Sequence, residues 1–257
     1  MTLRRVYVSA PLAAQAEHLE LTGEEHSYVT TVLRLGSGDR VQLFDRWGLR
    51  CDVVIEAVER RRSSLRVERW EASPVRPDSP VDVVLMQALL KGKGFELVLQ
   101  KATELGVARV VPLVTERTVV EPAPGKVDSR VGRWQRICGE AARQCGRTTV
   151  PVVDAPRSLA DALAMAPAGL RLGLWEGERS AGLREVLEAA RAGVATTVTL
   201  VIGPEGGLGW AEVEAMVSAG FRTVSLGARI LRAETAPLAA LVAVQLLLGD
   251  LGAAPGA

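Results

Sequence analysis

Two glycine-containing segments near the C-terminus hold residue types suited to binding a small ligand. Residues 203–207 read Gly-Pro-Glu-Gly-Gly after an apolar run, and residues 226–236 place Gly227 ahead of Arg229, Arg232 and Glu234. Glycine lacks a Cβ, so backbone amides and carbonyls can approach a ligand closely. If both segments follow neighbouring parallel strands, they form one pocket at the carboxyl edge of a sheet.

The first segment consists of Gly203, Pro204, Glu205, Gly206 and Gly207. Its spacing departs from the dinucleotide fingerprint, and no lysine followed by serine or threonine completes a P-loop. Amides at the start of the following helix would favour an anionic or polar group. The alternative is a tight turn in which Glu205 serves the start of that helix, and the pattern leaves both interpretations open.

The second segment combines charged and apolar side chains. An adenine ring needs a flat apolar slot with backbone groups at its edge, which Leu226, Gly227, Ile230 and Leu231 can supply. The charged neighbours would then face the substrate. The alternative is an ordinary surface loop in which the arginines pair with nearby carboxylates such as Glu234.

The elements that must position these segments alternate between strand and helix after residue 80. Short Val/Leu-rich strands separated by helices, one of them closed by Gly106, are typical of a parallel α/β sheet. The pattern predicts strands at 81–85, 109–114, 149–153, 170–175 and 197–202, and helices at 95–105, 132–145, from Trp210 onward, and 235–248.

The N-terminal part has a different periodicity. Residues 40–45 and 65–68 alternate like half-buried strands, with a turn at Arg46-Trp47-Gly48. Residues 73–80 contain three prolines. We therefore predict a small β-barrel domain over 1–72, a linker over 73–80 and an α/β domain over 81–257.

Composition sets limits without naming a function. The 257 residues are 48% hydrophobic with a net charge of +1, so an RNA-binding role must depend on local arginine clusters. Three cysteines fit neither a zinc site nor a disulfide framework, so we predict reduced thiols and no metal. The N-terminus lacks a secretory pattern, and residues 236–248 are too short to cross a bilayer. These features predict a cytoplasmic protein with no membrane partner.

The helix predicted from residue 132 separates into two faces. Trp134, Ile137 or Cys138, Ala141 and Cys145 form an apolar stripe that predicts buried thiols. The opposite face carries Arg133, Arg136, Arg143 and Arg147, for which a solvated surface is the simpler interpretation. We assign neither His18 nor His26 as a general base, and we expect a surface position for His26, with an RNA or packing role as the alternative. The run Arg60-Arg61-Arg62 predicts a solvated turn between strands.

Several motifs in order resemble the bacterial 16S rRNA uracil-N3 methyltransferases of the SPOUT superfamily. They are residues 26–35, Gly38-Asp39, Leu43-Phe44-Asp45, Lys91-Gly92, 100–107, Glu116-Arg117, Glu140-Ala141, 144–147 and the two glycine-containing segments. One departure is local, because family members often carry Asp-Gly where this chain has Asp45-Arg46-Trp47-Gly48. The insertion lengthens a turn and can alter RNA contacts there.

The resemblance implies a PUA-like β-barrel domain followed by a SPOUT α/β domain whose C-terminal part is threaded into a trefoil knot. It also implies a homodimer that acts in ribosome biogenesis, methylating N3 of a uridine in 16S rRNA or the small ribosomal subunit with S-adenosylmethionine. The cofactor would contact Leu174, Gly203, Pro204, Glu205, Gly206, Gly207, Leu226, Gly227, Ile230, Leu231 and Arg232.

RNA contacts are expected from basic residues that hold phosphate without reading sequence. These are Arg4, Arg5 and Arg34 in the barrel, Lys91, Lys93, Arg143 and Arg147 along the cleft, and Arg229. The alternatives are a SPOUT enzyme that methylates ribose 2′-oxygen and a non-catalytic RNA-binding assembly factor.

The predicted catalytic residues are Arg232 and Glu234. Neutral uracil N3 carries a proton and is a poor nucleophile, so a cation near the ring oxygens would stabilise the anion that must form. Arg232 is the first candidate for this cation. Glu234 would accept the proton or orient Arg232, but a carboxylate beside an arginine is a weak base and ranks second.

Overall fold

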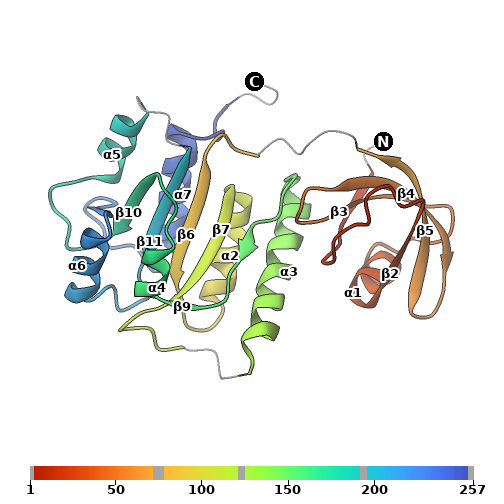
Figure 1. Cartoon of the computed structure of the whole chain (residues 1–257), viewed down its shortest axis with the longest axis horizontal. Helices are drawn as coiled ribbons and strands as arrows, with labels where there is room; N and C mark the ends of the chain where they lie inside the picture. Colours follow the sequence, from red (N-terminus) through yellow and green to blue (C-terminus); the bar gives the residue numbers. More distant parts are fainter. Residues whose placement is uncertain (1–2, 72–77, 121–124, 192–195, 254–257) are drawn as a thin grey trace. The chain divides into compact units, whose positions relative to one another are not determined.

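The structure, a computed structural model, describes residues 3–71, 78–120, 125–191 and 196–253. It contains two compact units (Figure 1). The first comprises Met1–Pro77 with Ala142–Val150, and the second comprises Asp78–Ala141 with Pro151–Ala257. The first unit therefore includes a segment far away in sequence. The predicted linker lies outside the described residues at positions 73–77.

The first unit is built on a five-stranded mixed sheet. Its strand order is β1 (Arg4–Tyr7), β3 (Arg40–Phe44), β4 (Arg50–Val58), β5 (Arg62–Trp70) and β2 (His18–Thr22). The pair β1–β3 is parallel and the other pairs are antiparallel. The helical turns α1 (Gly23–Ser27) and η1 (Tyr28–Val32) follow β2. Alternating residues such as Val41, Leu43, Val53 and Ile55 are fully buried, so the period of two predicted over 40–45 holds as far as residue 43, whereas Phe44 and Asp45 are both buried as well.

The second unit contains an all-parallel sheet. Its order is β12 (Arg222–Val224), β10 (Leu170–Leu174), β11 (Thr197–Ile202), β6 (Asp82–Ala88), β7 (Val107–Val114), with β8 (Val152–Val153) and β9 (Arg157–Ser158) both paired to β7. Residues 83–88 and 198–202 are buried without alternation. Such continuous burial is expected where helices cover both faces of a sheet.

Helices cover this sheet on both faces (Figure 1). The contacts of α4 (Leu159–Ala164) and α6 (Trp210–Ser218) with each other and with the core cluster around Met86 and Val111 place them on one face. On the other face α7 (Thr235–Leu247) contacts β6, β11, α2 (Gly94–Glu104) and α5 (Leu183–Ala190). The ring of Trp134 in α3 (Val127–Cys145) lies 4.8 Å from that of Phe95 in α2.

A buried polar residue anchors α7. Gln245 is 1% exposed, accepts a hydrogen bond from the Ser79 hydroxyl at 2.8 Å, and donates one to the Gly106 carbonyl at 3.2 Å. Gly106 follows α2 with φ +81°, and a Cβ there would lie 2.5 Å from Gln245 Nε2. The predicted end of α2 at this glycine is therefore confirmed, with two physical reasons for glycine.

Three local predictions are wrong. The strand expected at 149–153 is reduced to Val152–Val153. Cys145 is exposed because α3 ends at this residue, so the apolar stripe stops a turn earlier, while Cys138 is buried as predicted. His26 is 7% exposed, since its Nδ1 lies 2.9 Å from the hydroxyl of Ser63 and thus has a polar partner inside the unit.

Candidate functional site

A cavity of about 1450 Å³ lies in the second unit beside the carboxyl ends of β10, β11 and β12. It brings together most of the residues predicted to bind a ligand. Those that line it are Leu174, Gly203, Pro204, Glu205, Gly207, Leu226, Gly227, Ile230, Leu231, Arg232 and Glu234. Gly206 is the one predicted ligand residue that does not line it. The two segments identified from the sequence therefore meet in one site.

Residues 203–207, called the clamped loop below, follow β11 directly. The Gly207 amide donates to the Pro204 carbonyl at 2.9 Å, and Gly207 has φ +70°. A Cβ on Gly203 would lie 3.0 Å from Leu208 Cγ, and one on Gly207 would lie 2.9 Å from Glu176 Oε1. Close approach of Leu208 and the loop backbone explains glycine at position 203, and the positive φ explains it at position 207.

Two side-chain contacts hold the clamped loop from outside. The Lys91 amide donates to Glu205 Oε1 at 2.8 Å, and Arg117 Nη1 donates to the Gly206 carbonyl at 2.8 Å. The interpretation in which Glu205 serves the start of α6 is wrong. Glu212 has that role, since its carboxylate accepts from the Gly209 amide at 2.9 Å. The loop is therefore fixed by contacts from two neighbouring turns.

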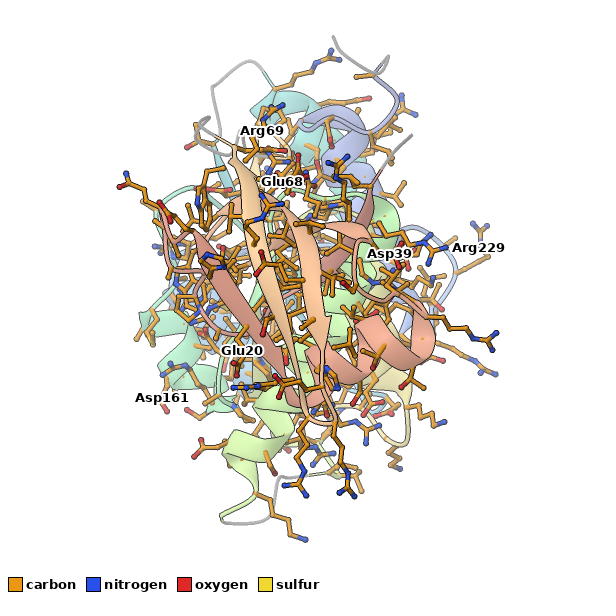
Figure 2. The ribbon with its side chains drawn as sticks, turned by 90° about the vertical axis from the view of Figure 1, so that its right-hand side faces the viewer. Glu20, Asp39, Glu68, Arg69, Asp161 and Arg229 are labelled. Carbon is orange, nitrogen blue, oxygen red and sulfur yellow. The ribbon has the colours of Figure 1, made fainter. Side chains whose placement is uncertain are left out.

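Residues 225–234, called the arginine loop below, are far more open. Ile230 is 85% exposed, and the side chain of Arg232 is 86% exposed. Arg229 projects outward from the loop (Figure 2). Arg232 Nη1 lies 3.9 Å from Glu234 Oε1, a separation that makes the pair weak at such an exposed position. The guanidinium of Arg232 is thus available to a ligand, while Ile230 alone forms no closed slot.

A third lining segment, residues 176–182, was missed by the sequence reasoning. The carboxylate of Glu178 accepts hydrogen bonds from the Thr223 hydroxyl at 2.5 Å, the Ser180 hydroxyl at 2.7 Å and the Ser180 amide at 2.7 Å. These bonds, that of Thr223 above all, lower the pKa of Glu178 to about 2. The sequence signal for this segment was the run of polar residues after β10. Its conformation, however, depends on the hydrogen bond from Thr223, which is distant in sequence.

The third segment is tied to the arginine loop through the backbone. The Ser225 amide donates to the Ala181 carbonyl at 2.9 Å, and the Leu183 amide donates to the Ser225 carbonyl at 2.9 Å. Gly182 and Ser225 form a parallel bridge. The start of the arginine loop is thereby fixed, although its tip is exposed.

The residues predicted to contact RNA fall into two groups. Lys91 and Arg229 line the cavity, and Lys93 is exposed two residues after Lys91. The remaining five belong to the first unit: Arg4, Arg5, Arg34, Arg143 and Arg147. Lys91 and Lys93 were predicted to lie along one cleft with Arg143 and Arg147, but the two pairs belong to different units.

Several basic side chains of the first unit make contacts within it. Arg5 Nη2 donates to the Arg147 carbonyl at 2.6 Å, and its guanidinium lies 4.2 Å from the centre of the Phe44 ring. Arg143 stacks at 4.8 Å over the ring of Tyr28. Arg34 is exposed and has φ +55°, which is uncommon for a residue with a side chain. Arg60 and Arg61 are exposed in the turn before β5, as predicted.

The described ranges contain neither a metal-binding cluster nor a membrane-spanning helix. Among residues 3–71, 78–120, 125–191 and 196–253, no group of three or more His, Cys, Asp or Glu side chains is placed to hold a metal ion. No helix in the same ranges is both long and apolar enough for a membrane span.

An all-parallel sheet with a glycine-lined cavity at its carboxyl edge defines an α/β protein with a small-ligand site. Residues 77–245 match the family model of an RNA methyltransferase domain. The chain belongs to this RNA methyltransferase family.

Curated relatives have the same name in several bacteria. The ribosomal RNA small subunit methyltransferase E of Bacillus subtilis is 32% identical over 243 residues, covering 92% of this chain and 94% of the relative. The protein of that name from Mycobacterium bovis is 34% identical over 230 residues, covering 88% and 85%. The similarity therefore extends over both units.

Solved structures are similar over almost the whole chain. A Legionella pneumophila methyltransferase in complex with the bound cofactor SAM has a TM-score of 0.86 at 32% identity and covers 98% of this chain and 100% of that one. The ribosomal RNA small subunit methyltransferase E of Neisseria gonorrhoeae, bound to S-adenosyl methionine, has a TM-score of 0.83 at 30% identity, with coverages of 97% and 100%.

Proposed function

We propose that this chain transfers the methyl group of S-adenosylmethionine to N3 of a uridine in the 16S rRNA of the small ribosomal subunit. The observation that carries the proposal is the meeting of the clamped loop and the arginine loop in one cavity. The names of the relatives support the small-subunit RNA as substrate. The motif resemblance supports uridine N3 as the acceptor atom.

The cavity suits the cofactor in size and lining. Small-molecule sites commonly enclose about 300–1,000 Å³. At about 1450 Å³ this cavity has room for a cofactor and part of an acceptor nucleotide. Backbone groups of Gly203 and Gly207 would hold polar parts of the cofactor, and Leu174, Leu226 and Leu231 would contact its adenine. When bound, S-adenosylmethionine supplies an electrophilic methyl carbon.

The chain's own contribution is to hold the acceptor in line and favour its deprotonated form. Arg232 would stabilise negative charge on the uracil oxygens, because its guanidinium is accessible and only weakly paired with Glu234. Exclusion of water by the bound RNA would strengthen this interaction. Glu234, whose side chain is 30% exposed, would orient Arg232 or accept the N3 proton.

The first unit is proposed to be a PUA-like RNA-binding domain spanning residues 1–72, with the catalytic domain spanning 81–257. Arg34 and Arg4 would contact phosphate, supported by the exposure of both side chains. Arg5, Arg143 and Arg147 would act there as well as through their contacts within the unit. Around the cavity Lys91, Lys93 and Arg229 would serve the same purpose.

The C-terminal part is proposed to form a trefoil knot and a homodimer. The motif resemblance supports the knot, and the bridge between Gly182 and Ser225 brings the arginine loop alongside the segment after β10. Exposed apolar residues of α7, Val242 at 37% and Leu246 at 58%, support a subunit contact on that helix. Light scattering of the purified protein tests the dimer.

The decisive experiment is a methyl-transfer assay with small ribosomal subunits from cells that lack the modification. Because ribosomal subunits are cytoplasmic, the proposed function places the protein in the cytoplasm. Mass spectrometry of the nucleosides should find 3-methyluridine. A ribose methyl group would contradict the acceptor atom. RNA binding without any transfer would instead identify an assembly factor.

A further inference from the structure

The turn between β3 and β4 in the first unit is unusually well fixed. Asp45 is fully buried, and its carboxylate accepts hydrogen bonds from the amides of Trp47 and Leu49, both at 2.9 Å, and of Leu12 at 3.0 Å. Gly48 closes the turn with φ +87°. A buried carboxylate with three amide donors fixes the backbone of the two residues between Asp45 and Gly48.

These two residues present an aromatic ring and a cation outward. Trp47 is 50% exposed, and the guanidinium carbon of Arg46 lies 4.3 Å from the centre of its ring. In the described part of the chain, Arg46 has no carboxylate within ion-pair distance. The turn therefore displays a half-exposed indole ring, with a guanidinium that has no ion-pair partner lying over one of its faces.

Packing does not explain this arrangement. Trp134 is 2% exposed and Trp70 donates its indole N–H to the Ala16 carbonyl, whereas Trp47 leaves half of its surface in water.

We propose that Trp47 and Arg46 form a stacking site for an unpaired base of the RNA substrate, an inference that rests on the proposed function. Every base has a π-face, and RNA-binding proteins use exposed aromatic rings and arginine planes to hold unstacked bases. The adjacent guanidinium attracts the neighbouring phosphate. A negatively charged nucleic acid fits this cationic turn better than an apolar protein surface does.

Four full-length variants test the proposal: Trp47→Ala, Trp47→Phe, Arg46→Ala, and a deletion of Arg46 and Trp47 that leaves Asp45 next to Gly48. Affinity for a 16S rRNA transcript is measured by fluorescence anisotropy over a salt series. Trp47→Ala and the deletion should weaken binding about fivefold to hundredfold, as loss of one base stack does. Trp47→Phe should retain most of the affinity.

The salt series separates stacking from charge. Arg46→Ala should reduce the slope of log affinity against log salt by about 0.7, whereas Trp47→Ala should leave the slope unchanged. Arg60→Ala is the matched control, because it removes an exposed charge from the same unit at a turn with no stacked ring. Its affinity should stay within twofold of the wild type.

Affinity of Trp47→Ala and of the deletion within twofold of the wild type overturns the stacking site and leaves a protein surface as its occupant. Far-UV circular dichroism and the Trp47→Phe variant distinguish that result from misfolding. If the wild type binds RNA in a Trp47-dependent manner but transfers no methyl group, the proposed function fails while the stacking site stands.

Discussion

The two loops that form the cavity differ in how they are held. The clamped loop is fixed by two hydrogen bonds. The Glu205 carboxylate accepts one from the Lys91 amide, and Arg117 donates the other to the Gly206 carbonyl. The arginine loop is anchored at Ser225 and at the start of α7, but its tip leaves Ile230 and Arg232 exposed. A preformed loop and an open loop thus face each other across one site.

This difference separates two tasks. A fixed loop can bind a cofactor without losing further conformational entropy, so binding affinity should depend on its clamps. The open loop carries Arg232, whose charge gains strength only when a ligand excludes water. Cofactor affinity and catalytic turnover should therefore respond to substitutions in different loops.

The largest expected effect is on turnover. Arg232→Ala should lower kcat about 100- to 1,000-fold, the cost typical of removing one group that stabilises a developing anion. Cofactor affinity, measured by calorimetry, should stay within a few-fold, and Arg232→Lys should recover part of the rate. Near-normal turnover of the alanine variant would remove Arg232 from the mechanism.

A smaller effect should follow from releasing the clamped loop. Glu205→Ala removes the acceptor of the exposed Lys91 amide, which costs about 0.5–1.5 kcal/mol, or up to roughly tenfold in cofactor affinity. Glu205→Gln keeps an acceptor oxygen and is the matched control. If both variants bind S-adenosylmethionine like the wild type, the clamp has no role in binding and the comparison between the loops collapses.

The third segment provides a test by pH. The hydrogen bonds of Glu178 lower its pKa from 4.5 to about 2, so their contribution to stability is complete above pH 4.5 and is lost as the pH falls toward 2. Thr223→Val removes the largest of these bonds, so the pKa of Glu178 should rise toward 4.5. Carboxyl-carbon NMR of both proteins measures this shift, and identical titrations would exclude the Thr223 contact.

The smallest effect is expected from the ion pair in the arginine loop. Glu234→Gln should change the free energy of unfolding by less than about 1 kcal/mol, since Arg232 and Glu234 are 3.9 Å apart and the arginine is 86% exposed. Urea denaturation measures it. A larger loss would mean that the open loop is fixed by this pair.

Local patterns predicted the elements that depend on local chemistry. The strand at 197–202 and the end of α2 at Gly106 agree with the structure, because apolar runs and a positive-φ glycine are readable in sequence. Both glycine-containing segments of the cavity were readable for the same reason. They follow strands, and parallel strands bring their carboxyl ends to one edge.

Features that depend on distant partners were not readable. His26 is buried because Ser63 bonds its ring, and the segment after β10 is ordered because Thr223 bonds Glu178. Residues 142–150 belong to the first unit, and this could not be predicted because it depends on which distant residues contact the end of α3. Each of these outcomes depends on a residue far away in sequence, which no local periodicity reports.

Gln245 has a consequence for the last helix that its composition hides. A helix rich in alanine, leucine and valine could rotate about its own axis and still bury apolar groups. Any such rotation would break the hydrogen bonds of the buried Gln245 amide to the Ser79 hydroxyl and the Gly106 carbonyl, and would leave this amide without partners. One amide thereby fixes the rotation of the helix about its axis. This rotation also determines that Val242 and Leu246 are among the exposed side chains.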